Sequence, residues 1–275
     1  LADNEKLALI SKKLVTLQDD VPVKDKIENF LIKDIKKDKL YNFLREMEFN
    51  RLLSQAISFY GESNKKIENI KSANEKINLN KYETIVSEED FDKWIEILKK
   101  QSLISVDTET SSLNPIIAKL VGISFCYKHG KACYIPLKNK GKKCLDLEIV
   151  LKKIKPILED ESIKKIGQNI KFDYIILKKN KININPIEDT MLASYTLDAG
   201  LNRHNLDTLS EIHLGHKTIT FKDLVGSGKN KITFSEVDLK KATEYAGEDA
   251  DVTFRLYKLL KDRLDKEKLT KVYEI

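Results

Sequence analysis

Cysteine is scarce in this chain. Only Cys126, Cys133 and Cys144 occur among 275 residues, and none of them forms a C-x-x-C pair. An odd, scattered set argues against a disulfide framework and against a zinc knuckle, so a reducing cytoplasm is the simplest setting. The histidines are too scattered to predict a zinc site either; they are His129, His204, His213 and His216.

Long apolar runs are also absent. The stretch Ala118–Cys126 is among the longest and is already broken by Lys119, whereas a membrane-spanning helix requires about 18 apolar residues in succession. The chain begins with Leu1, not Met, and shows no signal-peptide pattern. We therefore expect no membrane association, and a piece trimmed from a longer protein.

Charge is abundant and of both signs. Charged residues make up 33% of the chain and hydrophobic residues 41%, a balance typical of a soluble, folded protein. The formal net charge is +6, and lysine supplies most of the positive charge. This basic excess is compatible with a nucleic-acid partner, but solvated surface lysines explain it as well.

The pattern of apolar residues divides the chain into two regions. Residues 1–61 are predicted to form a helical segment, clearest over 38–60, with Gly61 as the C-cap. Residues 62–80 are polar and predict a linker. Residues 81–275 begin with strands, alternate strands with helices and end in helices, which predicts an α/β fold with a mixed sheet flanked by helices.

Individual elements of the larger region follow from the same spacing. A hairpin tip is expected at Lys128-His129-Gly130. The expected strands are 82–86, 102–109, 120–127, 131–137 and 163–167, and the expected helices are 87–98, 146–159, 169–179, 189–197, 206–214 and about 235–264.

Three segments place carboxylates in unusual surroundings, and the first is Ser105–Thr110. It ends an apolar strand, and residues two apart in a strand face the same side, so Asp107 and Glu109 would point together. Two adjacent carboxylates repel each other and are costly to desolvate, and a divalent cation between them would remove the conflict. A solvated strand end is the alternative.

The second segment is Gly167–Asp173, where a strand leads into a helix. Asp173 falls near the first helical turn, on the side where Asn169 also lies. Because the helix dipole favours an acid at this place in any protein, a structural role is the alternative for Asp173 read alone.

The third segment runs from Tyr245 to Asp251. On a helix Tyr245 and Asp249 share a face, and the apolar residues that continue this face predict that Asp249 is partly buried. Gly247 costs about 1 kcal/mol relative to Ala inside a helix, which indicates that another group approaches the backbone closely. Glu248 and Asp251 are expected to be solvated, and ordinary core packing is the alternative for Tyr245.

Taken in order, these segments resemble the proofreading 3′→5′ exonuclease domain of bacterial DNA polymerase I, which belongs to the tyrosine branch of the DEDD exonucleases. The resemblance covers roughly 81–275 and implies an RNase H-like fold. It rests on the three motifs and on two intervening segments: Asp107-Thr108-Glu109-Thr110, Gly167–Asp173, Tyr245–Thr253, Arg203–Leu209 and His216–Phe221.

The resemblance also implies which residues act. Asp107, Glu109 and Asp249 would hold a first divalent cation, and Asp107 would share a second with Asp173. Oxygen-only ligands favour Mg²⁺ or Mn²⁺. Tyr245 would orient the attacking water by hydrogen bonding, because a phenol with a pKa of about 10 is a poor base at neutral pH.

Two further positions match family contacts to a single-stranded or frayed 3′ end of DNA. Leu113 would wedge against the terminal bases, with simple core packing as the alternative, and Asn169 would contact the strand. Gly226-Ser227-Gly228-Lys229 lacks the spacing of a phosphate-binding loop, and we interpret it as a plain loop.

Residues 1–60 resemble the C-terminal end of the neighbouring 5′-nuclease domain, through Leu1–Val23 and Leu44–Phe49. The acidic cluster for 5′-nuclease chemistry is expected upstream, and a polymerase domain of the same parent chain is the expected partner. We therefore expect a monomeric piece with neither 5′-nuclease nor DNA synthesis activity, from a protein that acts in DNA replication and repair.

Two other functions stay open from the sequence alone. An RNase D-like enzyme that trims RNA would keep the same carboxylates and differ in its tolerance of the 2′-hydroxyl. A non-catalytic DNA-binding spacer is the other alternative. The presence of all four carboxylates and of Tyr245 argues against it.

Overall fold

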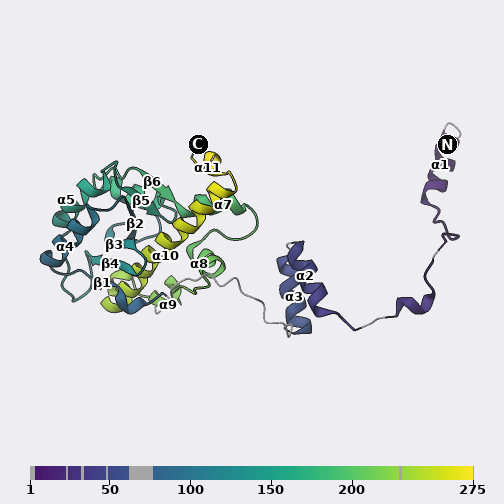
Figure 1. Cartoon of the computed structure of the whole chain (residues 1–275), viewed down its shortest axis with the longest axis horizontal. Coiled ribbons are helices and arrows are strands. Elements are labelled where there is room, and N and C mark those ends of the chain that lie inside the picture. Colours follow the sequence, from purple (N-terminus) through teal and green to yellow (C-terminus); the bar gives the residue numbers. More distant parts are fainter. Residues whose placement is uncertain are drawn as a thin grey trace. The chain divides into compact units, whose positions relative to one another are not determined.

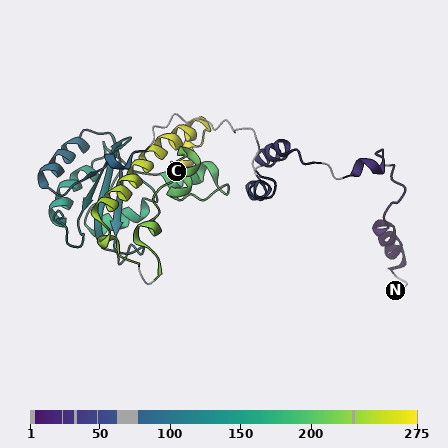
Figure 2. The ribbon, with the colours of Figure 1, turned by 90° about the horizontal axis from the view of Figure 1, so that it is seen from below.

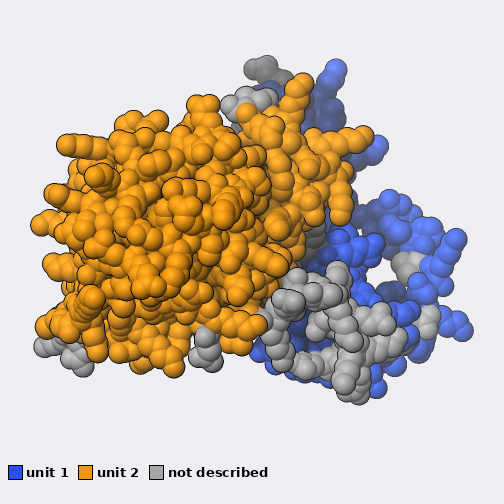
Figure 3. Space-filling view, turned by 60° about the vertical axis from the view of Figure 1, so that its left-hand side comes forward, with its two compact units in different colours: residues 1–71 blue, residues 72–275 orange. Residues whose placement is uncertain are grey.

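The computed structural model describes residues 4–22, 24–31, 34–47, 49–61, 77–228 and 231–274. The chain forms two compact units, residues 1–71 and 72–275, which Figure 3 colours separately. The linker predicted for 62–80 lies largely outside the described residues, which omit 62–76.

The smaller unit is helical. It contains α1 (Glu5–Val15), a 3₁₀ turn at Ile27–Phe30, α2 (Lys37–Glu46) and α3 (Asn50–Tyr60). The apolar pattern over 38–60 therefore belongs to two helices. The chain turns between them so that they pack against each other and bury Tyr41 and Leu44. The Tyr41 hydroxyl donates to the carbonyl of Gly61 at 2.6 Å, and Gly61 ends α3 with a positive φ of 78°, as expected of the C-cap.

The described part of the larger unit is built on a six-stranded mixed sheet in the order β1-β4-β3-β2-β5-β6. The pairs β2–β3 and β3–β4 are antiparallel and the other pairs are parallel, so the predicted mixed sheet is confirmed. The strands are β1 (Glu83–Thr84), β2 (Leu103–Thr110), β3 (Leu120–Lys128), β4 (Lys131–Pro136), β5 (Lys164–Gly167) and β6 (Ile187–Asp189).

Helices cover both faces of the sheet (Figures 1 and 2). Side chains of α4 (Glu88–Leu98), α5 (Leu147–Leu158) and α6 (Lys171–Lys179) share one core with the strands. The long helix α10 (Leu239–Lys266) crosses the opposite face and contacts β2, β3 and β4. The shorter helices are α7 (Thr190–Asp198), α8 (Leu206–Leu214), α9 (Phe221–Val225) and α11 (Thr270–Tyr273).

Side-chain caps fix where the main helices begin. The Ser87 hydroxyl accepts the Asp90 amide before α4, and the Asp146 carboxylate accepts two amides before α5. The expected helix start near Ser235 is wrong by four residues. Thr233 caps the start of a separate 3₁₀ turn, where it forms a capping box with Glu236, and Asp238 then caps α10.

None of the helices in the described ranges combines the length and the hydropathy that crossing a membrane demands.

Candidate active site

Strand β2 and helix α10 bring three carboxylates together. On β2, the Ser105 hydroxyl donates to the backbone carbonyl of Ala250 at 2.7 Å, so the face that carries Ser105 is turned toward α10. Asp107 and Glu109 follow at two-residue steps on the same face. Oxygen atoms of Asp107, Glu109 and Asp249 all lie within 4.8 Å of one another.

Asp173 stands beside this group and is held differently. It lies in the first turn of α6 and is only 2% exposed. Its Oδ1 accepts the amide of Thr108 at 2.9 Å and the hydroxyl of Thr108 at 2.5 Å. The side chain is thus fixed to the β2 residue that separates Asp107 from Glu109.

The four carboxylates perturb one another. Burial raises the pKa of Asp107 to about 6. Burial, together with the charge of Asp107, also raises the pKa of Glu109, Asp173 and Asp249 well above the ordinary range. An ionised set is therefore costly unless positive charge enters the site.

A divalent cation fits this arrangement. Glu109 Oε1 is buried and has no hydrogen-bond partner within the described ranges. A buried acceptor without a donor is uncommon in native proteins and asks for an explanation. Because the assembled side chains offer only carboxylate oxygens, a hard cation such as Mg²⁺ or Mn²⁺ would satisfy Oε1 and neutralise the charge.

Tyr245 lies one turn before Asp249 on α10 and shares its face of the helix. Burial, followed by the neighbouring carboxylates, raises the pKa of Tyr245 above its ordinary value, so the phenol stays neutral. Its ring packs against Phe221 and Phe234, with centroids 6.2 and 6.0 Å away. Tyr245 thus combines core packing with a contact to the carboxylate group.

The close approach expected at Gly247 is confirmed. A Cβ atom at this position would lie 2.8 Å from the ring of Tyr82. The Tyr82 hydroxyl donates to Asp251 at 3.0 Å, and Asp251 also accepts the Gly130 amide at 2.9 Å and Arg255 Nε at 3.0 Å. The expectation that Asp251 is solvated is therefore wrong, because it is fully buried and paired.

Glu248 is likewise fully buried, against the expectation. His216 Nε2 lies 2.6 Å from its Oε1, and the Ile219 amide donates to its Oε2 at 2.7 Å. The reason is that α10 contacts the sheet and also α7, α8 and α9, so that more than one of its faces is covered. Helical periodicity alone predicts a single buried face.

The turn that carries Asn169 depends on an acid that sequence reasoning missed. Asn169 has a positive φ of 58°, so α6 begins two residues later than expected. Asp189 accepts the Asn169 and Ile170 amides at 3.0 and 3.1 Å and also caps α7. An Asp at the start of the helix expected over 189–197 is an N-cap signal that could have identified it.

Leu113 and Phe221 are both accessible. Leu113 follows β2 and is 84% exposed, which excludes core packing. Phe221, which the sequence analysis did not single out, is 37% exposed while its ring contacts Tyr245. The loop after α9 has positive φ angles at Gly226 and Gly228, whereas Lys229 lies outside the described residues.

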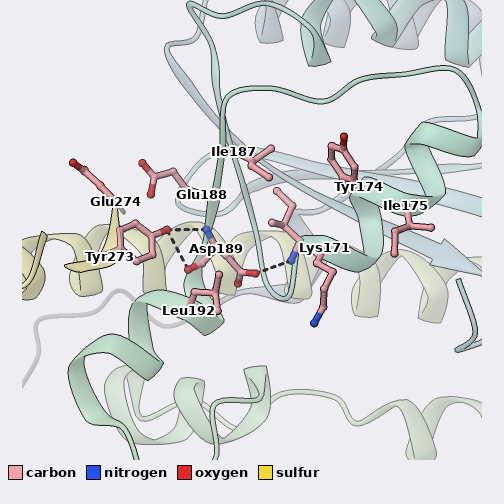
Figure 4. Close-up of a pocket in the computed structure, with 10 residues that line it drawn as sticks. Lys171, Tyr174, Ile175, Ile187, Glu188, Asp189, Leu192, Tyr273 and Glu274 are labelled. Atoms are coloured by element: carbon pink, nitrogen blue, oxygen red, sulfur yellow. Dashed lines mark hydrogen bonds between the residues drawn. The ribbon is translucent and has the colours of Figure 1, made fainter. Parts of the chain in front are cut away.

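A separate cavity of about 630 Å³ lies between α6, β6, α7 and α11 (Figure 4). Its walls are mainly aliphatic and aromatic, and Lys171, Glu188 and Glu274 add charges of both signs. The described residues that line it include none of the four clustered carboxylates. The Tyr273 hydroxyl accepts the Asp189 amide at 2.9 Å, which ties α11 to the start of α7.

Comparison with known proteins identifies the larger unit. A family model described as 3′–5′ exonuclease matches residues 82–265. DNA polymerase I of Pseudomonas aeruginosa is 34% identical over 96% of this chain, and DNA polymerase I of Rhizobium leguminosarum is 43% identical over 70% of it. The structure of Brucella melitensis NrnC shares the fold with a TM-score of 0.52 and 23% identity, covering 70% of this chain and 84% of NrnC.

The chain spans less than a third of the curated relatives that it matches, 29% of the first and 21% of the second. The RNase H-like fold expected from the sequence is confirmed by the mixed sheet and by the NrnC likeness. The chain belongs to the 3′–5′ exonuclease family and is homologous to DNA polymerase I.

Proposed function

We propose that the larger unit is a metal-dependent exonuclease that hydrolyses nucleotides from the 3′ end of DNA. One observation supports this above the others: oxygens of Asp107, Glu109 and Asp249 lie within 4.8 Å of one another, and Glu109 Oε1 lacks a partner among the described residues. A nucleic-acid substrate follows from membership of the exonuclease family.

Asp107, Glu109 and Asp249 would hold the first of two divalent cations, and Asp107 and Asp173 would hold the second. Bound Mg²⁺ or Mn²⁺ would supply charge neutralisation and a more acidic water. A structure of Brucella melitensis NrnC contains bound Mg²⁺, which favours this ion as the first to test.

The protein's own side chains would orient the reactants. Tyr245 remains neutral and acts as a hydrogen-bond donor that positions the attacking water near Asp249. Leu113 and Phe221 are exposed and would contact the terminal bases, and Asn169 would contact the strand. Packing of bases against such side chains tolerates any sequence, which suits an enzyme that trims ends.

The homologues suggest the setting. The parent protein would be a cytoplasmic DNA polymerase I acting in replication and repair, in which the polymerase domain of the same chain passes frayed 3′ ends to this site for proofreading. We further propose that residues 1–61 are the end of a 5′-nuclease domain, that 62–80 is a linker, and that the chain is monomeric.

The test is release of mononucleotides from 3′-labelled single-stranded DNA with Mg²⁺ or Mn²⁺, repeated with excess chelator and with Asp107→Ala. Release that needs the metal and Asp107 supports the proposal. Faster release from matched RNA would favour the RNase D-like alternative. Absence of both cleavage and Mn²⁺ binding by calorimetry would favour the non-catalytic spacer.

A further inference from the structure

The loop between β2 and β3 follows directly on the strand that carries Asp107 and Glu109, and it presents apolar side chains to solvent. It starts two residues after Glu109, the last carboxylate of β2. Leu113, Ile116 and Ile117 are 84%, 69% and 68% exposed. Single exposed apolar residues are ordinary, but three on one loop next to a reaction site indicate a surface that contacts a ligand.

Hydrogen bonds between residues of the loop account for only some of its backbone carbonyls. The Ser111 amide donates to the Lys119 carbonyl, and the amides of Ile117 and Ala118 donate to the Asn114 carbonyl. The carbonyls of Pro115, Ile116 and Ala118 have another donor.

That donor is the ammonium of Lys179. Its Nζ lies 2.9 Å from the carbonyl of Pro115, 2.8 Å from that of Ile116 and 2.7 Å from that of Ala118. An ammonium group has three hydrogens, so these three loop carbonyls accept all the hydrogen bonds that Lys179 can donate. Charge-assisted hydrogen bonds of this kind are stronger than neutral ones.

Helix α6 connects this contact to the active site. Lys179 is its last residue and Asp173 lies in its first turn. At the Asp173 end the helix is attached to Thr108 of β2, and at the Lys179 end to the loop that follows β2. Six residues of α-helix span about 9 Å, so one rigid element sets the position of the loop relative to the carboxylates.

We propose that Lys179 is a positioning residue for the substrate strand. It holds the loop 111–119 so that Leu113, Ile116 and Ile117 form an apolar edge beside the carboxylates, against which bases near the 3′ end pack. This inference rests on the proposed exonuclease function. The described hydrogen bonds of the Lys179 ammonium go to backbone carbonyls of the loop, so this residue acts on strand binding and not on the hydrolytic step.

The whole chain is compared with three variants. Lys179→Met removes the ammonium and keeps the aliphatic stem, and Lys179→Arg restores donors. Lys178→Met is the matched control, because the Lys178 ammonium bonds the Asn183 side chain and lies over the Tyr174 ring, away from the loop. Measurements are amide hydrogen exchange at Ile117 and Ala118, affinity for 3′-labelled single-stranded DNA with chelator present, and kcat and KM with Mg²⁺.

For Lys179→Met we expect faster exchange at both amides, and a Kd and KM raised about threefold to tenfold, as for loss of one partly exposed charge-assisted contact. Its kcat should stay within about twofold of the parent value, since the hydrolytic groups are untouched. Lys179→Arg should recover most of the affinity, and Lys178→Met should change neither exchange nor affinity.

Unchanged exchange in Lys179→Met would overturn the claim that this residue holds the loop. Faster exchange with unchanged affinity would overturn its role in strand binding. If the parent chain binds DNA without cutting it, the proposed function fails and the affinity comparison still decides the role of Lys179. If the parent chain binds no DNA, both proposals are overturned.

Discussion

Helix α10 carries acids of two kinds within four residues, the fully buried Glu248 and Asp251 and the half-buried Asp249, and they differ in how their charge is compensated. Asp251 accepts hydrogen bonds from Tyr82, Gly130 and Arg255, and Glu248 accepts from Ile219 and contacts His216. Asp249 instead faces two further carboxylates, those of Asp107 and Glu109.

The comparison teaches that burial of an acid does not mark a reaction site. Asp251 and Glu248 are the most buried acids of the helix, yet the protein itself supplies their partners. The cluster of Asp107, Glu109 and Asp249 differs because three carboxylates converge there and Glu109 Oε1 has no hydrogen-bond partner in the described part of the chain. Four predictions test this distinction.

The largest effect is expected on activity. Asp249→Ala should lower exonuclease turnover by at least about a thousandfold, as expected when one member of a jointly acting group is removed. The circular dichroism spectrum and the unfolding midpoint should show an intact fold, because the change relieves repulsion in the metal-free state. Turnover within tenfold of the parent value would contradict a role for Asp249 at the reaction centre.

The next largest effect is expected on the stability of the fold when Asp251, the acid paired with Arg255, is replaced. Asp251→Ala should lower the free energy of unfolding by about 3 kcal/mol or more, since it leaves the buried Arg255 guanidinium without its carboxylate. Urea denaturation measures the change. The surface variant Glu161→Ala is the control and should stay within about 0.5 kcal/mol. An equally small loss for Asp251→Ala would mean that the ion pair with Arg255 contributes little to the stability of the fold.

For Glu109 in the carboxylate cluster, we expect the free energy of unfolding to change in the opposite direction. Glu109→Gln should raise the free energy of unfolding of the chelator-treated chain by about 1 kcal/mol at neutral pH, because one of the crowded charges disappears. Mg²⁺ or Mn²⁺ should stabilise the parent chain and should stabilise the variant less. Destabilisation of the metal-free variant would show that another group of the protein already compensates the negative charge of Glu109.

The last prediction concerns the pH dependence of the stability of the metal-free chain. The pKa of Asp107 is about 6 in the folded state, against about 3.9 in an unfolded chain. Between these values the folded state binds more protons, so the free energy of unfolding should fall as pH rises from about 4 to about 6. Saturating Mn²⁺ should weaken this slope, and a slope of opposite sign would mean that Asp107 is stabilised in its ionised form.

Much of the fold followed from the sequence, and the gaps have physical causes. The alternation in β2 placed Asp107 and Glu109 on one face, and Gly247 correctly indicated a close neighbour, now identified as Tyr82. The partners of Glu248 and Asp251 include His216 and Gly130, which lie 32 and 121 positions away, and local periodicity contains no information on such contacts. The roles of Tyr245, Leu113 and Asn169 remain predictions.

The candidate site is also divided along the chain. Asp107 and Glu109 belong to the second strand, Asp173 to a helix in the middle and Asp249 to the long helix near the end of the unit. During synthesis the ribosome releases the first pair well before α10 exists, so the three clustered carboxylates cannot meet until α10 has been made and has packed on the sheet. Under the proposed function, an incompletely synthesised or misfolded chain would lack nuclease activity and could not degrade the DNA of the cell.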